Sequence, residues 1–319
     1  RPVQQFLLDQ SLPPGLVIIE APMGEGKTEA AWILAEKWRS EACSGMYMAL
    51  PTMATSNSLF DRYSNDYLGR LERECKARLV HGMAWLRDDL EPESPQVCGG
   101  EDDPSIADTW FRPTRRAFLC EHGVGTVDQA MLAGMNVKFS FLRLHGLVGR
   151  VLVIDEVHAY DSYMSAIICR LLEWCACLRI PVILLSATLS ARQRAAMLQA
   201  YGYPDPAPDG DAPYPLVSSV SFSRELSSRS VAASSTRSLK IEEHEGMLGD
   251  APSTAKLAEF LVIGGGCCCV ILNTVRQAQA VFEALNMPDQ ERMLFHARFS
   301  AQDRERIANT VSRLFGRDR

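Results

Sequence analysis

Apolar runs alternate with amphipathic stretches along the first part of the chain. The short apolar runs are residues 16–20, 45–50, 151–155 and 182–186. Each is long enough for a strand buried on both faces. Residues 29–38 and 162–178 repeat their apolar positions at helical spacing. Apolar strands separated by helices predict an α/β fold, in which helices cover both faces of a parallel sheet.

The same alternation returns near the end of the sequence. Helices are predicted at residues 253–263, 275–285 and 301–315, and strands at residues 267–273 and 292–295. We therefore predict a first domain at residues 1–202 and the first part of a second, related domain at residues 239–319. Residues 203–238, rich in Pro, Ser and Asp, are predicted to be a linker or insertion, and an acidic surface insertion is predicted at about residues 86–116.

Composition narrows the class of protein. The 319 residues are 47% hydrophobic and 23% charged, as in ordinary globular proteins. We expect no contact with membranes, because no apolar run is long enough to span a bilayer. A net charge of −6 argues against binding nucleic acid by bulk charge, although a local basic groove is compatible with it. None of the ten cysteines forms a Cys-x-x-Cys pair, so we expect reduced, buried thiols in a cytoplasmic protein rather than structural zinc.

A phosphate-binding loop (P-loop, residues 21–28) stands between the first predicted strand and helix. Its glycines let backbone N–H groups point at phosphate oxygens. Lys27 is expected to reach the β and γ phosphates of ATP, and the Thr28 hydroxyl to ligate Mg²⁺. The nucleotide contacts predicted here are Met23, Gly24, Glu25, Gly26, Lys27, Thr28 and Glu29.

Two further motifs close apolar strands. Asp155 and Glu156 follow the strand at residues 151–155, where ligands bind in an open parallel sheet. Asp155 is expected to hold Mg²⁺ and Glu156 to orient the attacking water, so that these two residues and Lys27 are the predicted catalytic set. Ser186, Ala187 and Thr188 lie at the end of the strand at residues 182–186. In this position their small side chains are suited to relaying the state of the nucleotide to the loops that bind nucleic acid.

Together these residues resemble a known family. Gly-x-Gly-Lys-Thr, Asp-Glu-x-His and Ser-Ala-Thr, in this order, are the signature of superfamily 2 helicases. The runs that resemble the helicase part of the CRISPR-associated helicase–nuclease of type I systems, the type I-E branch above all, are residues 20–31, 50–57, 113–122, 125–131, 141–147 and 155–161. The resemblance implies RecA-like domains and an ATP-driven translocase on single-stranded DNA, which works in antiviral defence with a crRNA-guided surveillance complex.

The resemblance also assigns roles to single residues. It implies that Gln4 reads the adenine edge, and that His158 couples the nucleotide to Ser186, Ala187 and Thr188. The implied nucleic-acid contacts are Pro51, Thr52, Thr55, Asn57, Thr126, Asp128, Gln129, Asn273, Thr274, Arg276, His296 and Arg298. Loops of this kind hold phosphates without reading sequence.

Several points stay open. Residues 110–116, with Trp110 and Arg115, either line a single-strand channel or anchor the insertion. The sequence holds no His-Asp dipeptide and no Gln-x-x-Gly-Arg-x-Gly-Arg segment, so we expect no nuclease site and little ATP hydrolysis from this chain alone. The alternative functions are a non-enzymatic module that docks on the surveillance complex or an inhibitor, and a superfamily 2 RNA helicase.

Overall fold

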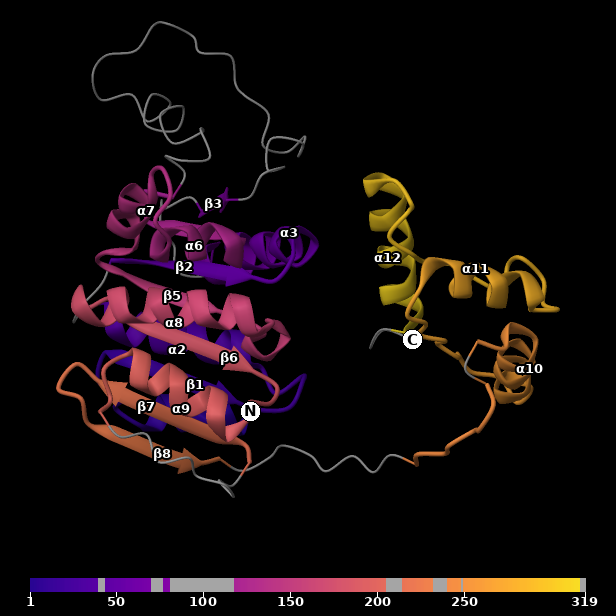
Figure 1. Ribbon diagram of the computed structural model, residues 1–319, viewed down its shortest axis with the longest axis horizontal. Helices are drawn as coiled ribbons and strands as arrows, with labels where there is room; N and C mark the ends of the chain where they lie inside the picture. Colours follow the sequence, from indigo (N-terminus) through magenta and orange to yellow (C-terminus); the bar gives the residue numbers. More distant parts are fainter. Residues whose placement is uncertain are drawn as a thin grey trace, which may run out of the picture. The chain divides into compact units, whose positions relative to one another are not determined.

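The computed structural model describes residues 1–39, 44–69, 77–80, 118–204, 214–231, 240–247 and 249–315. The chain divides into two compact units, Arg1–Thr236 and Arg237–Arg319 (Figure 1). Among the described residues, no helix is long and apolar enough to cross a membrane. The insertion predicted at about residues 86–116 lies outside the described residues.

A mixed sheet forms the first unit, with its strands in the order β3-β4-β2-β5-β6-β1-β7-β8. The strands are β1 Gly15–Glu20, β2 Gly45–Leu50, β3 Ala77–Val80, β4 His122–Thr126, β5 Arg150–Ile154, β6 Val182–Ser186, β7 Leu216–Ser221 and β8 Leu226–Ser230. The strands from β3 to β1 are parallel to one another. Strands β7 and β8 form an antiparallel hairpin that continues the sheet beyond β1. The predicted parallel core is confirmed, and the hairpin adds to it.

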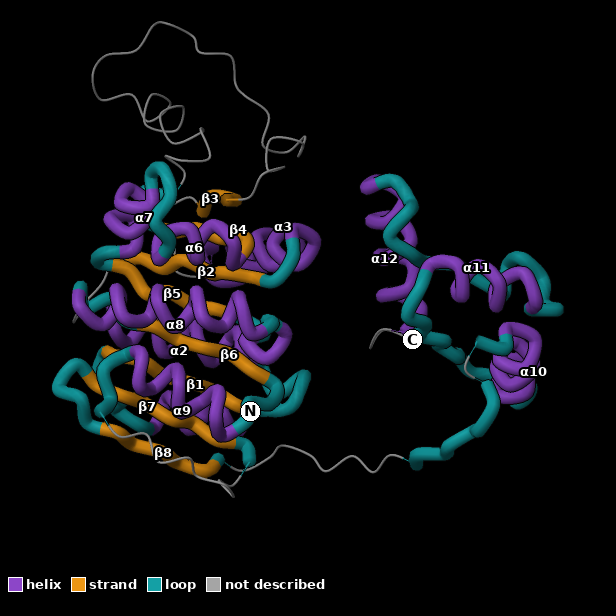
Figure 2. Tube along the Cα trace, in the orientation of Figure 1, coloured by secondary structure: helices purple, strands orange, loops and turns teal. Residues whose placement is uncertain are grey.

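Helices cover both faces of this sheet, as predicted. They are α1 Pro2–Asp9, α2 Lys27–Arg39, α3 Met53–Arg62, α6 Val127–Gly134, α7 Ser140–Leu147, α8 Ser162–Cys177 and α9 Ala191–Ala200, with a π-helical turn at Tyr63–Leu68 and a 3-10 turn at Val157–Ala159. Helices α8 and α9 lie in front of the strands and α2 lies behind them (Figure 2).

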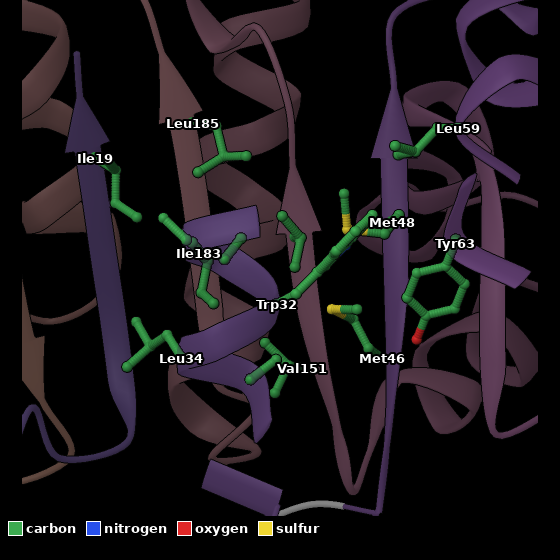
Figure 3. Packing of buried hydrophobic residues seen from close by; sticks show 14 of the residues in the cluster. Ile19, Trp32, Leu34, Met46, Met48, Leu59, Tyr63, Val151, Ile183 and Leu185 are labelled. Carbon is green, nitrogen blue, oxygen red and sulfur yellow. The ribbon is translucent and has the colours of Figure 1, made fainter. Parts of the chain in front are cut away.

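Alternate residues of the central strands enter two separate apolar cores. In β1, Val17 and Ile19 join the core under α2, whereas Leu16 and Ile18 join the core under α8. The first core contains side chains from the strands and from the helices that cover this face of the sheet (Figure 3). They include Ile19, Trp32, Leu34, Met46, Met48, Leu59, Tyr63, Val151, Ile183 and Leu185. Burial on both faces explains why these strands are continuously apolar in sequence.

The prediction that residues 203–238 are a linker or insertion is wrong in part, because β7 and β8 lie there. All six residues of β7 are buried, although half of them are serines. The hydroxyl groups of these serines are bonded: Ser228 contacts Ser218 at 3.3 Å, and Ser219 donates to the Ser227 carbonyl at 3.4 Å. A serine-rich sequence is therefore compatible with a buried strand here, since its polar groups have partners.

The sequence interpretation also missed β4, whose residues include two glycines. A Cβ atom added to Gly125 would lie 2.2 Å from the Val80 carbonyl oxygen and 2.5 Å from the Tyr47 hydroxyl. Glycine is required at this position because neighbouring groups approach the backbone closely, and such glycines weaken the local strand pattern.

The second unit contains helices α10 Ala251–Val262, α11 Val275–Ala284 and α12 Ala301–Phe315, as predicted. The strands predicted at residues 267–273 and 292–295 are wrong, because no strand is assigned among the described residues 240–315. Cys267 and Cys269 are exposed, so their predicted burial is wrong too, whereas Cys120 and Cys175 are buried as expected. An extended segment becomes a strand only when a neighbour pairs with it, and the described residues of this unit supply no such pairing.

Replacing Leu34 tests the core of the first unit. Leu34 is fully buried, so Leu34→Ala should lower the free energy of unfolding by about 2–5 kcal/mol. All five tryptophans precede residue 237, so the tryptophan fluorescence of a urea titration reports this unit alone. The matched control is Leu8→Ala, since Leu8 is 51% exposed. Equal shifts for the two variants would contradict the assigned core.

Candidate functional site

The predicted site residues of the first unit lie along one edge of the sheet, where the parallel strands have their carboxyl ends. Glu20 at the end of β1 is paired in register with Ser186 at the end of β6. The Ala21 N–H donates to the Ser186 carbonyl at 3.2 Å, and the Asp155 N–H donates to the Ala49 carbonyl at 2.9 Å. The P-loop, the acidic pair (Asp155 and Glu156) and the coupling loop (residues 186–189) therefore start from neighbouring strand ends.

The P-loop curls around the side chain of its own lysine. Gly24 and Gly26 have φ angles of 81° and 75°, in the left-handed region that glycine adopts without steric cost. The buried Lys27 ammonium donates to the carbonyl oxygens of Ala21 at 2.8 Å and Pro22 at 3.2 Å. Burial lowers the pKa of Lys27, and the carboxylates of Glu156, Asp155 and Glu25 partly oppose this shift. The loop thus holds the positively charged Lys27 ammonium group at its centre.

Two predicted nucleotide contacts lie beside this loop in defined positions. The Gln4 side-chain amide donates to the Gly26 carbonyl at 3.2 Å, so the structure brings Gln4 to the P-loop. Glu29 accepts from the Arg62 guanidinium of α3 at 2.5 Å. Met23 is 81% exposed, and Thr28 is half-buried at the start of α2. Gln4 therefore supports the loop from α1, while Glu29 connects it to α3.

The acidic pair is crowded and conformationally constrained. The Asp155 carboxylate accepts from the Glu156 N–H at 2.8 Å. Burial, with the Glu156 carboxylate beside it, raises the pKa of Asp155 to about 6. Glu156 has a φ angle of 52°, which a side-chain-bearing residue adopts only at an energetic cost. A bound cation would relieve the repulsion between these carboxylates, so the pair fits the predicted magnesium site.

His158 connects the acidic pair to the coupling loop. Its Nε2 atom lies 3.1 Å from the Glu156 carboxylate, and its Nδ1 atom accepts from the Ala187 N–H at 3.2 Å. Because Nδ1 accepts, a neutral imidazole carries its proton on Nε2, the ring nitrogen that contacts Glu156. The Ser186 hydroxyl lies 3.1 Å from Nδ1 and 2.8 Å from the Thr188 carbonyl. Ala187 is therefore hydrogen-bonded to His158, whose other ring nitrogen contacts Glu156, and Ser186 and Thr188 are bonded to each other beside this pair.

Sequence reasoning missed other residues of this edge. Glu20 is buried and accepts from the Arg194 guanidinium at 2.7 Å and from the Leu189 N–H at 3.1 Å. Tyr160 donates its hydroxyl to the Asp155 carbonyl at 2.9 Å, and Tyr214 donates to the Ala187 carbonyl at 2.7 Å. A glutamate that ends an apolar strand was a signal for Glu20. No local sequence pattern indicated a role for Arg194, Tyr160 or Tyr214.

The predicted nucleic-acid loops of the first unit follow β2 and β4, two adjacent parallel strands. Their last residues, Leu50 and Thr126, are register partners, so the structure brings the two loops together. Thr52 caps α3, because its hydroxyl accepts from the Thr55 N–H at 3.2 Å. The hydroxyls of Thr52 and Thr55 thus have a local structural role, and their contact with nucleic acid stays a prediction.

The remaining candidates in these loops differ in exposure. Asp128 is exposed, Pro51 and Asn57 are half-buried, and the Gln129 amide accepts from Arg143 of α7 at 3.3 Å. The exposed groups are available to a ligand at this edge, whereas Gln129 is already held by α7.

In the second unit the candidates surround the start of α11 and the segment before α12. Thr274 caps α11 by accepting from the Gln277 N–H at 3.2 Å, between the exposed Asn273 and Arg276. His296 accepts from the N–H of the exposed Arg298 at 3.3 Å and stacks on Phe299 with ring centroids 4.3 Å apart. All of these contacts lie within the second unit.

Comparison with known proteins points to one family. A family model described as CRISPR-associated nuclease/helicase Cas3, C-terminal, matches residues 264–319. The chain is 36% identical, over 88% of its length, to the CRISPR-associated endonuclease/helicase Cas3 of Thermus thermophilus, of which it covers 30%. It therefore spans about a third of the length of this relative.

Solved structures agree with this match. The crystal structure titled T. fusca Cas3-ATP superposes on the entire chain with a TM-score of 0.83 and 32% identity, and the chain covers 38% of it. A chain from the structure titled CRISPR RNA-guided surveillance complex, pre-nicking, matches 99% of the chain with a TM-score of 0.70 and 27% identity, and 36% of it is covered. The RecA-like fold predicted from the sequence is confirmed by these similarities.

The pKa of Asp155 predicts a pH-dependent stability. Its folded value of about 6 lies above the ordinary 3.8, so this group costs stability as the pH rises through both values. Without nucleotide and with a metal chelator, Asp155→Asn should raise the free energy of unfolding at pH 8 by on the order of 1–2 kcal/mol. The gain should shrink as the pH falls toward 4. Urea titrations by tryptophan fluorescence measure it, with the exposed Asp66→Asn as control. A gain independent of pH would contradict the assigned cause.

Proposed function

Because this chain corresponds to the helicase region of the Cas3 nuclease/helicases, we propose that it is the ATP-binding part of a translocase that acts on single-stranded DNA in CRISPR interference. The observation that carries this proposal is the set of contacts from Glu156 through His158 to the coupling loop: His158 Nε2 lies 3.1 Å from the Glu156 carboxylate, and His158 Nδ1 accepts from the Ala187 N–H. Such a connection suits an enzyme that converts ATP hydrolysis into movement, and it has no evident use in a purely docking module.

The P-loop and the acidic pair supply the groups for hydrolysis. Lys27 would exchange its bonds to the carbonyls of Ala21 and Pro22 for bonds to the β and γ phosphates. Thr28 and Asp155 would hold Mg²⁺, which neutralises charge on the phosphates when it is bound. Among the described residues no cluster of three His, Cys, Asp or Glu side chains is arranged to hold a metal ion, and Mg²⁺ ordinarily uses one or two protein ligands with phosphates and water.

Glu156 would orient the attacking water and accept its proton. His158 Nε2 lies 3.1 Å from the Glu156 carboxylate, and we infer that this contact helps to orient the carboxylate. Its other ring nitrogen holds the Ala187 N–H, which makes the position of the coupling loop depend on the state of Glu156. We infer that this linkage passes the state of the nucleotide to the rest of the domain.

The loops after β2 and β4 would grip the nucleic acid. They lie together at the same sheet edge and offer hydroxyl, amide and backbone N–H groups, which bind phosphates of any sequence. A surveillance complex is the proposed partner, since a similar chain is part of a solved structure of a CRISPR RNA-guided surveillance complex. ATP is the proposed nucleotide because the similar T. fusca protein has a crystal structure as Cas3-ATP.

Replacing Glu156 separates nucleotide binding from hydrolysis. In the full-length protein, Glu156→Gln should leave the Kd for ATP nearly unchanged and lower kcat by about 10²–10⁴-fold, because the water loses its base. Lys27→Ala should instead weaken ATP binding. The matched control is Glu173→Gln, whose carboxylate lies on the exposed surface of α8. Fluorescent-nucleotide binding and phosphate release measure the two quantities. Loss of binding in Glu156→Gln would contradict the assigned role.

The identity of the track distinguishes a DNA translocase from an RNA helicase. Full-length protein should displace a labelled strand when the single-stranded track is DNA and fail when the same track is RNA. Lys27→Ala should abolish displacement on either track, which serves as the control for ATP dependence. Equal or faster displacement along RNA would overturn the DNA assignment in favour of the RNA helicase.

A further inference from the structure

Tyr214 contacts the coupling loop from a part of the chain that the proposed function does not use. It lies two residues before β7, and its hydroxyl group donates to the Ala187 carbonyl at 2.7 Å. The first residue of β7, Leu216, is the register partner of Glu20, the last residue of β1. Tyr214 is therefore carried to the edge of the sheet where the P-loop begins.

The coupling loop is bonded from several directions. The N–H of Ala187 donates to His158, and the carbonyl of Thr188 accepts from Ser186, so these two bonds stay within the predicted coupling residues. The N–H of Leu189 donates to the buried Glu20 carboxylate. The carbonyl of Ala187 accepts from Tyr214. Ala187 is thus held at its N–H group by His158 and at its carbonyl group by Tyr214.

The bond from Tyr214 to the coupling loop lies at the protein surface. Tyr214 is 48% exposed, so its ring leaves no buried cavity when it moves. Partial burial and the nearby carboxylates of Glu20 and Glu25 raise the pKa of the Tyr214 hydroxyl, so it keeps its proton and remains a donor. By contrast, the buried Glu20–Arg194 pair holds Leu189 in a fixed place, because separating it would leave a buried charge without its partner.

We propose that Tyr214 is a positioning residue that holds the Ala187 carbonyl, so that movement of His158 during the ATP cycle is transmitted through the coupling loop rather than absorbed by it. This inference rests on the proposed function, since it assumes that the protein couples ATP hydrolysis to DNA. Leu189 is the fixed end of the loop, Ala187 is its moving part, and Tyr214 limits how far Ala187 moves.

The test is Tyr214→Phe in the full-length protein, with Tyr203→Phe as the matched control. Tyr203 packs against the same sheet, and within the described residues its hydroxyl makes no hydrogen bond. Steady-state ATPase assays with and without single-stranded DNA give the ratio of stimulated to unstimulated kcat. Loss of one hydrogen bond should lower this ratio by about two- to tenfold, with the KM for ATP unchanged. Amide hydrogen exchange at residues 187–189 should become faster in the same variant.

Each other outcome has a separate meaning. If DNA stimulates the wild type and the ratio for Tyr214→Phe equals that for Tyr203→Phe, the role given to Tyr214 is overturned and the proposed function stands. Equal losses of stimulated and unstimulated kcat would also overturn it, because Tyr214 would then support the ATP site rather than coupling. If DNA does not stimulate the wild type, the proposed function fails, and this inference fails with it.

Discussion

The parallel register of β1 against β6, in which Glu20 lies opposite Ser186, is the constraint on which the candidate site depends. The P-loop leaves the sheet directly after Glu20, and the coupling loop leaves it directly after Ser186. A slip of one residue would turn alternate side chains to the other face, so the buried Glu20 would leave Arg194 and Leu189. The close fit of side chains of different size and shape in the two cores opposes this slip, and the packing of the sheet therefore sets the geometry of the site.

The site itself is costly for the fold. Burial and like charge raise the pKa of Asp155, burial lowers the pKa of Lys27, and Glu156 has a left-handed backbone. Each feature disfavours the folded, ligand-free protein, as is typical of a site whose charged groups are compensated by a ligand of opposite charge, and this agrees with the proposed binding of phosphates and a cation. The strands that carry these residues are buried on both faces, which supplies the stability that the site gives up.

Sequence alone was sufficient where the physics is local. Continuous apolar runs predicted β1, β2, β5 and β6, because a strand buried on both faces needs apolar residues throughout. It was insufficient where a residue's meaning depends on a distant neighbour. Gly125 reads as a weak strand residue until Val80 and Tyr47 are seen against it. Residues 267–273 have a strand pattern but no paired neighbour among the described residues, so the structure assigns no strand there.

The direction of β7 explains why Tyr214 escaped notice. In a parallel sheet the functional residues follow their strands, and the P-loop, the acidic pair and the coupling loop were all found in this way. Strand β7 is antiparallel to β1, so its first residue rather than its last lies at the functional edge. The chain before an antiparallel strand is therefore as close to the chemistry as the chain after a parallel one. Residues that precede a strand antiparallel to the parallel set, as Tyr214 precedes β7, therefore lie at the same edge as the proposed nucleotide site.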